Sequence, residues 1–262
     1  MESTKITPWK MYEVCKAGFT RQPVPSSLTL QDGSTTTSEK ETANALLQTF
    51  FPDDSTAQDS GKQRNIRAQI TELGPPDSQI EQNFTEHEVD KVIRNLDDSK
   101  CPGPDGIDGI TVNRLHKCLP KFLISIFNKC FALGCFPKEW KKARVIATPK
   151  SDKTKLQSVQ GYRGISLLSI PEKCLEKLVI GRLNYFLETA GQIPSLQHGF
   201  TAGRSTADAI KTVSEFVGHS RKLGLKCCLL ALDIAGTFDN AWHPGILVQL
   251  WKLKVPQTPT AW

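Results

Sequence analysis

The sequence predicts an α+β fold in which helices dominate and strands are few. Amphipathic helical patterns recur along the chain, as over 171–190, where Leu175 and Leu178 follow helical spacing. Two apolar runs, 143–149 and 227–234, are short and bounded by turn residues, as buried strands are. Helices mixed with few, widely separated strands, without an internal repeat, indicate an α+β domain.

Residues 1–84 are expected to form a linker that is partly disordered. A Ser/Thr-rich run and three breakers interrupt any long element: Pro23, Pro25 and Gly33. One helix is predicted over 38–51, because Ser38 can cap it and Glu41 can complete a capping box. The apolar side of this helix comprises Ala45, Leu46, Phe50 and Phe51. The following residues, 51–65, are predicted to be an exposed loop.

From residue 85 the pattern becomes more regular. The predicted elements are a helix over 85–96, an irregular stretch over 99–109, a helical stretch over 111–133 and a strand over 143–149. Thr85 with Glu88 caps the first helix. The irregular stretch holds two prolines and three glycines, which cannot propagate a helix. Pro120 is expected to break the second helical stretch, and Gly134 to end it.

The second half of the chain predicts three more helices and one strand. In order they are a helix over 171–190, a helix from 205 to 224, a strand over 227–234 and a helix over 243–254. Ser205 with Asp208 caps the 205–224 helix, and Gly224 ends it. Its apolar face comprises Ala209, Ile210, Val213, Phe216 and Val217.

Charge is distributed unevenly along the chain. The formal net charge is +6, but residues 1–85 carry 8 basic and 11 acidic side chains, whereas residues 86–262 carry 25 and 16. The excess is greatest over 138–155, with seven basic and two acidic residues. Such a segment attracts phosphate backbones. A lysine-rich, solvated surface is the other interpretation.

Cysteine usage and hydropathy indicate an intracellular protein, and we expect it in the cytoplasm and nucleus. The eight cysteines show no CxxC pairing and no zinc spacing with histidine, so we expect reduced thiols. Cys227 and Cys228 are expected on opposite faces of the 227–234 strand. No stretch approaches the ~20 apolar residues of a membrane span, and the N-terminus lacks a signal-peptide core.

The most informative motif is LLALDIAGTFDN, residues 229–240. Asp233 ends the apolar run, so its carboxylate is expected where the strand emerges into a cleft. Mg²⁺ prefers oxygen ligands and is commonly held by one or two carboxylates together with substrate phosphates. An acid that merely caps the following turn is the other interpretation.

Five blocks in a fixed order resemble the reverse transcriptases of non-LTR retrotransposons, with the jockey type as the nearest. They are PGPDGI (102–107), FPKEWKKARVIATPK (136–150), GYRGISLLSIPEKCLEKLVIGRL (161–183), QHGFTAGRSTADAI (197–210) and the 229–240 motif, which resembles motif A. The upstream ALLQTFFPDD (45–54) resembles the linker of these elements. Group II intron maturases are a related alternative, but the upstream linker resembles that of the jockey type more closely.

The resemblance implies polymerase fingers and upper palm over 85–225, then the start of the palm over 226–262. The implied reaction is RNA-templated DNA synthesis by two-metal nucleotidyl transfer, which copies a mobile element at a nicked target. The implied partners are an RNA template, a DNA primer, dNTP and Mg²⁺. Asp233 would be the catalytic metal ligand, together with the carbonyl oxygen of Ile234.

The resemblance also assigns roles to residues around the incoming nucleotide and the template. Arg163 would grip the triphosphate through its planar fork, and Lys150 would assist as a point charge. Phe238 would exclude the sugar 2′-hydroxyl. Gly203 and Arg204 would lie near the template, with backbone N–H groups before the helix left for phosphate. The basic residues Lys141, Lys142 and Arg144 would complete the template surface.

Several positions depart from the family pattern. Gly164 replaces a usual proline, so the turn after Arg163 is expected to lose rigidity. Thr201 replaces a usual arginine, which removes a phosphate contact, and Thr237 replaces a usual alanine. Two interpretations of Asp239 are equally good, a structural acid in the turn and a residue with a role in the chemistry.

The 262 residues contain no block resembling the later Gln-Gly segment or the paired Asp-Asp hairpin, and no thumb. Because one carboxylate cannot organise two Mg²⁺ ions, the chain by itself is expected to be catalytically inactive. A non-catalytic nucleic-acid-binding module and a poorly folding relic are the alternatives that the sequence leaves open. Oligomeric state is not indicated.

Overall fold

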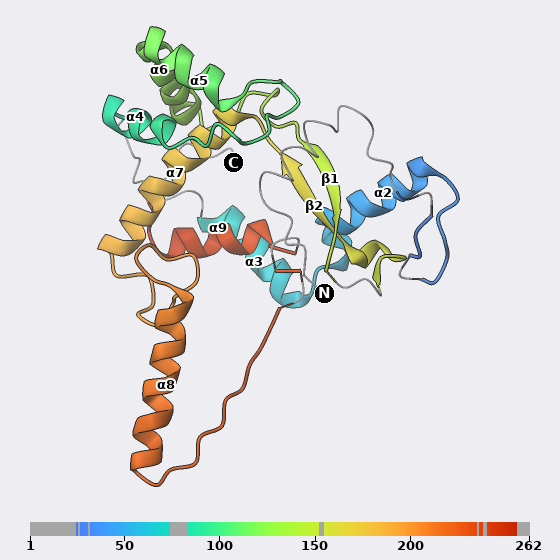
Figure 1. The fold of residues 1–262 in the computed structure, drawn as a ribbon, viewed down its shortest axis with the longest axis vertical. Coiled ribbons are helices and arrows are strands. Elements are labelled where there is room, and N and C mark those ends of the chain that lie inside the picture. Colours follow the sequence, from blue (N-terminus) through green and yellow to red (C-terminus); the bar gives the residue numbers. More distant parts are fainter. Residues whose placement is uncertain are drawn as a thin grey trace. The chain divides into compact units, whose positions relative to one another are not determined.

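The computed structural model describes residues 25–255 apart from 26, 31, 74–82, 152–154, 235 and 238–239. Two compact units are present, the first comprising residues 1–182 with 239–262 and the second residues 183–238. Each is described by itself below, with the elements labelled as in Figure 1. Among the described residues, no helix is long and apolar enough to cross a membrane.

Four helices form the larger hydrophobic core. They are α4 (Glu86–Arg94), α5 (Gly109–Cys118), α6 (Pro120–Ala132) and α7 (Ile170–Thr189). Val89, Ile93 and Phe127 are fully buried in this core, together with Leu175 of α7. The predictions for this region are confirmed, including the Thr85–Glu88 capping box and the break before Pro120. Gly134 ends the stretch with a positive φ of 57°.

The irregular stretch before α5 is fixed to the start of α7. Ser169 Oγ donates a hydrogen bond to Asp105 Oδ2 at 2.6 Å. Gly103 lies so close to the backbone of Leu168 and Ser169 that a Cβ there would collide with it. The glycine therefore permits the loop to pack directly on the α7 N-terminus.

The only sheet among the described residues is a two-stranded antiparallel hairpin of β1 (Arg144–Pro149) and β2 (Tyr162–Leu167). The prediction of β1 is confirmed. Strand β2 was not predicted, because the apolar alternation that marks a strand is interrupted by Gly164. Gly164 pairs with Ala147 inside the sheet, so the interpretation of this position as a turn was wrong.

The segment before residue 85 packs on this hairpin. Helix α2 (Glu39–Phe50) and residues 28–30 bury Leu28, Leu46 and Phe50 against Val159 and one face of the strands. Figure 1 shows α2 beside β1 and β2. The helix and its Ser38 cap are confirmed. Two details were wrong: the Glu41 carboxylate accepts from the N–H and hydroxyl of Thr37, and Phe51 is exposed.

Residues 51–65 are not simply a loop, contrary to the prediction. They contain a short 3₁₀ helix, η1 (Thr56–Gln58), and the first turn of α3 (Gly61–Leu73). Helix α3 packs against α9 (His243–Lys252), as Figure 1 also shows. The absence of long apolar side chains in the first turn of α3 concealed the helix, whose stability comes from this contact.

A charged cluster links the two helices. Arg67 of α3 pairs with Asp54 and with the buried Asp59, and its guanidinium lies 5.4 Å from the ring centroid of Trp242, the residue before α9. The Trp242 indole N–H donates to Asp54 at 3.2 Å. The Arg67 hydrogen bond lowers the pKa of Asp54.

The second unit contains α8 (Thr206–Lys222), whose N-terminus is capped by the Ser205–Asp208 capping box, as predicted. Its apolar face is not buried: Ile210 and Phe216 are each 67% exposed. The predicted strand over 227–234 is wrong, because these residues form no strand and Leu229, Leu230 and Leu232 are exposed. A strand needs a hydrogen-bonded neighbour, and no described segment pairs with this one.

Candidate active site

The β1–β2 hairpin places Arg163 on the face opposite to the side chains that pack on α2. Side chains alternate along a strand, and Val145, Ala147 and Tyr162 pack toward α2. Arg163 pairs with Thr148 in the register, so both project from the opposite face. Arg163 is exposed there. The hairpin therefore presents the guanidinium that the sequence assigns to a triphosphate on the side away from the core.

Lys150 directly follows β1, at the end of the hairpin where the loop joins the two strands. Its backbone N–H donates to the carbonyl of Gly161 at 2.7 Å, and its ammonium donates to the carbonyl of Gln160 at 2.8 Å. A side chain at Gly161 would collide with the carbonyl of Lys155. The ammonium thus closes the loop between the strands, and its phosphate contact stays a prediction.

The basic residues that precede β1 are exposed. Lys141 and Lys142 lie in or next to a turn, and Arg144 is the first residue of the strand. The Lys142 ammonium pairs with Glu139 at 2.9 Å, with both side chains more than 60% exposed. A pair in such high dielectric contributes little, so Lys142 remains available to an anion of higher charge density.

Asp233 and Ile234 belong to the second unit, in the extended segment after α8. Both are exposed. The Ile234 carbonyl accepts a hydrogen bond from the Thr237 hydroxyl at 2.7 Å and keeps a second lone pair. A carboxylate and a carbonyl are the hard oxygen ligands that suit Mg²⁺. The Asp233 carboxylate and the Ile234 carbonyl are therefore ligands of the chemical type that Mg²⁺ binds. Phe238 and Asp239 lie outside the described residues.

The predicted template loop is held by Arg204 itself. Its Nη1 donates to the carbonyl oxygens of Pro194, Ser195 and Gln197 at 2.6–2.9 Å. Gly203 adopts a positive φ of 72°. The expectation that the N–H groups before α8 are left for phosphate was wrong at Ser205, whose N–H donates to Asp208. An acidic cap at this end disfavours a second anion.

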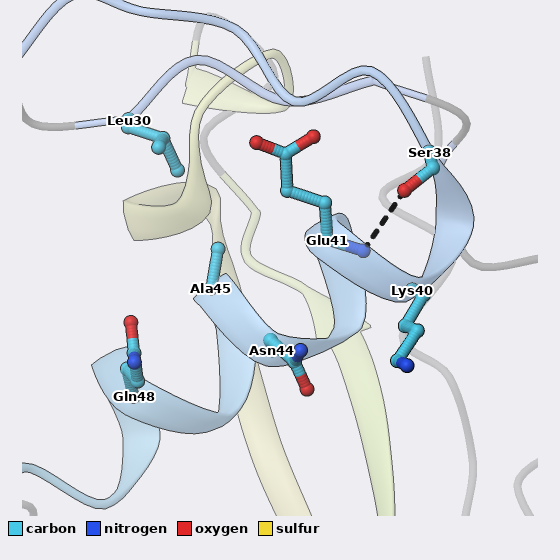
Figure 2. Close-up of a pocket in the computed structure, with 7 residues that line it drawn as sticks. All are labelled: Leu30, Ser38, Lys40, Glu41, Asn44, Ala45 and Gln48. Atoms are coloured by element: carbon cyan, nitrogen blue, oxygen red, sulfur yellow. Dashed lines mark hydrogen bonds between the residues drawn. The ribbon is translucent and has the colours of Figure 1, made fainter.

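Sequence reasoning missed the contact between Phe50 and the hairpin. The signal for it was a glycine inside a strand, which often marks close approach of another element. A pocket of about 400 Å³ lies beside α2, lined by Leu30 and six residues of 38–48 (Figure 2). It contains none of the predicted site residues.

Comparison with known proteins identifies relatives over nearly the whole chain. The reverse transcriptase (RNA-dependent DNA polymerase) family matches residues 138–262, which include the hairpin, the 197–210 block and Asp233. The chain is 31% identical over 261 residues to the RNA-directed DNA polymerase from mobile element jockey of Drosophila melanogaster. That match covers 97% of this chain and 28% of the relative.

Two further relatives come from type-1 retrotransposable elements. A putative 115 kDa protein in element R1DM of Drosophila melanogaster is 31% identical over 93% of the chain and 22% of its own length. The retrovirus-related Pol polyprotein from element R1 of Bradysia coprophila is 29% identical, over 93% and 23%. The chain spans about a quarter of the length of these curated relatives. It belongs to the reverse transcriptase family of non-LTR retrotransposons.

Proposed function

We propose that this chain supplies the fingers and the first palm segment of an RNA-directed DNA polymerase that copies a retrotransposon RNA. The observation that carries the proposal is the β1–β2 hairpin. Its exposed face holds Arg163, and the basic residues Lys141, Lys142 and Arg144 precede or begin its first strand. Triphosphate and template both carry dense negative charge, so one basic element can serve both.

Arg163 is proposed to bind the triphosphate of the incoming dNTP. A guanidinium donates two parallel hydrogen bonds to phosphate oxygens, which orients the phosphate as well as attracting it. Thr148 lies opposite Arg163 in the register, so its hydroxyl lies on the same face. Strand pairing fixes the Arg163 backbone, which reduces the ordering cost of binding.

Asp233 is proposed as the metal ligand, with the Ile234 carbonyl beside it. When bound there, Mg²⁺ would neutralise the nucleotide phosphates during in-line displacement. Phe238 is proposed to exclude the 2′-hydroxyl and so to favour dNTP. The Thr237 hydroxyl holds the Ile234 carbonyl, which orients this ligand before the metal arrives.

Salt-dependent RNA binding tests the template surface. The dissociation constant of the purified chain for a labelled single-stranded RNA should be measured between 50 and 200 mM KCl. Neutralising Lys141, Lys142 and Arg144 together removes three phosphate contacts, so the slope of log affinity against log salt should fall by about 2. The loss should be uniform across RNA sequences, because phosphate contacts do not read bases.

A charge-matched triple variant is the control. Lys40, Lys62 and Arg64 are exposed on α2 and α3 and do not belong to the basic segment 141–144. Replacing them changes the net charge equally and should leave the salt slope nearly unchanged. Equal losses in the two triple variants would reduce the effect to net charge and contradict the proposed surface.

Primer extension tests the assignment of Asp233. Any Mg²⁺-dependent extension of a primer on an RNA template should disappear in Asp233→Ala, whereas Asp208→Ala, which alters only a helix cap, should retain it. Extension that persists in Asp233→Ala would refute the metal-ligand role.

A further inference from the structure

The packing of α2 on β2 leaves no room for a side chain at Gly164. A Cβ built there would lie 2.6 Å from Cδ2, 2.8 Å from Cγ and 3.2 Å from Cβ of Phe50. Ordinary carbon contacts begin near 3.5 Å, so even a methyl group would overlap the ring. The glycine is therefore matched to the ring of Phe50.

Phe50 cannot move aside to relieve such an overlap. Only 6% of it is exposed, and it shares a small core with Leu28, Leu46 and Val159. The end of α2 is fixed as well, because the N–H of Phe51 donates to the Leu47 carbonyl at 2.8 Å. Close-packed interiors resist added volume, so strain at Gly164 would pass into the backbone of β2.

The residue that this strain would displace is Arg163. It precedes Gly164 directly and projects from the opposite face of the same strand. A two-stranded hairpin is marginally stable by itself, so the element packed on its inner face determines where the strand lies. For β2 that element is α2, which also touches the η3 turn (Val159–Gly161) before the strand.

We infer that Phe50 is a positioning residue for Arg163, acting through its contact with Gly164. This inference rests on the proposed nucleotide role of Arg163. Residues 39–50, which precede the family match by more than 80 residues, would then be part of the nucleotide site and not only a linker. Removing the ring should weaken triphosphate binding without removing any group that touches the nucleotide.

A thermal-unfolding cycle tests the contact. In the purified chain, Gly164→Ala should lower the midpoint by roughly 3–6 °C. Gly181→Ala is the matched control, because a Cβ at that helical position meets nothing within 4 Å, and it should not lower the midpoint. In a Phe50→Ala background, or Phe50→Leu if alanine prevents folding, Gly164→Ala should cost little. An equal cost in both backgrounds would overturn the contact.

Titration with Mg²⁺–dTTP tests the positioning, at a temperature well below every midpoint. Arg163→Ala should raise the dissociation constant about tenfold. Phe50→Ala should raise it severalfold but add nothing when combined with Arg163→Ala, whereas RNA affinity through Lys141 should stay unchanged. A Phe50 effect that is additive with Arg163→Ala, or absent, would overturn the inference.

Binding of Mg²⁺–dTTP that is undetectable, or unaffected by Arg163→Ala, would refute the proposed nucleotide role of Arg163 and the positioning role of Phe50 with it. The unfolding cycle would still report the contact between Phe50 and Gly164 in that case.

Discussion

Replacing Arg182 by alanine would remove a guanidinium that ties α7 to α4. Arg182 Nε and Nη2 donate to the two carboxylate oxygens of Glu88 at 3.0 and 3.1 Å, and Nη2 also donates to the Asn83 carbonyl at 2.9 Å. The same guanidinium lies 4.5 Å from the ring centroid of Phe84 and 5.4 Å from that of Phe131. Its side chain is 17% exposed.

The pKa of Glu88 sets the scale of the effect. Burial raises this pKa, but the hydrogen bonds from Arg182 and Thr85 outweigh burial and lower it to about 2 from 4.5. At about 1.36 kcal/mol for each pKa unit, this shift corresponds to a net contribution of about 3.4 kcal/mol from the ionised Glu88 carboxylate. Glu88 is about one-third exposed and Thr85 shares the effect, so about 1–2 kcal/mol belongs to Arg182. Loss of the ring stacking adds about 1 kcal/mol.

Urea unfolding should therefore show that Arg182→Ala lowers the free energy of unfolding by about 2–3 kcal/mol at pH 7. Because the folded pKa of Glu88 lies below the unfolded one, its contribution is complete above pH 4.5 and is lost as the pH falls toward 2. The variant should show a shallower decline over this window. Arg94→Ala is the control, since the Arg94 side chain is 76% exposed in its pair with Asp90. A loss below 0.5 kcal/mol, or equal pH slopes, would refute the reasoning.

Three further outcomes are expected. Arg67→Ala should lower the thermal midpoint and speed hydrogen exchange at the start of α9, because it leaves the buried Asp59 carboxylate unpaired; unchanged exchange would contradict this role. Arg204→Ala should increase exchange and proteolysis in residues 194–203, whereas retained protection would show that its three carbonyl bonds are dispensable. Burial raises the pKa of Cys174 to about 12, so iodoacetamide at pH 8 should label Cys227 well before Cys174, and equal labelling would contradict the burial.

The elements that could be predicted from the sequence are those whose signals are local. The Thr85–Glu88 and Ser205–Asp208 capping boxes each occupy four consecutive residues, and both helices start where the boxes place them. Pro120 and Gly134 likewise act on their own backbone. The motifs of the candidate site were also found locally, since each is a short block of fixed residue types.

Elements that depend on a distant partner were predicted poorly. Helix α3 has a weak apolar pattern, and its contact with α9 comes from residues far along the chain. The expected free N–H groups before α8 failed for a local reason instead, because the Asp208 side chain of the capping box accepts from the Ser205 N–H. Arg204 was interpreted as a phosphate contact from its residue type alone, and its three carbonyl partners depend on the path of the 194–197 loop.

One predicted strand does not form and one strand that forms was not predicted, and both errors have the same cause. Residues 227–234 have a strong strand pattern but no described neighbour, and they form no strand. Residues 162–167 have a weak pattern interrupted by Gly164, yet they pair along six residues with β1 and pack on Phe50. Pairing and packing decide whether a run becomes a strand, since β propensity largely reports the fit to neighbours. The same dependence explains why an aromatic ring in the N-terminal segment can set the position of Arg163 although no local motif connects the two.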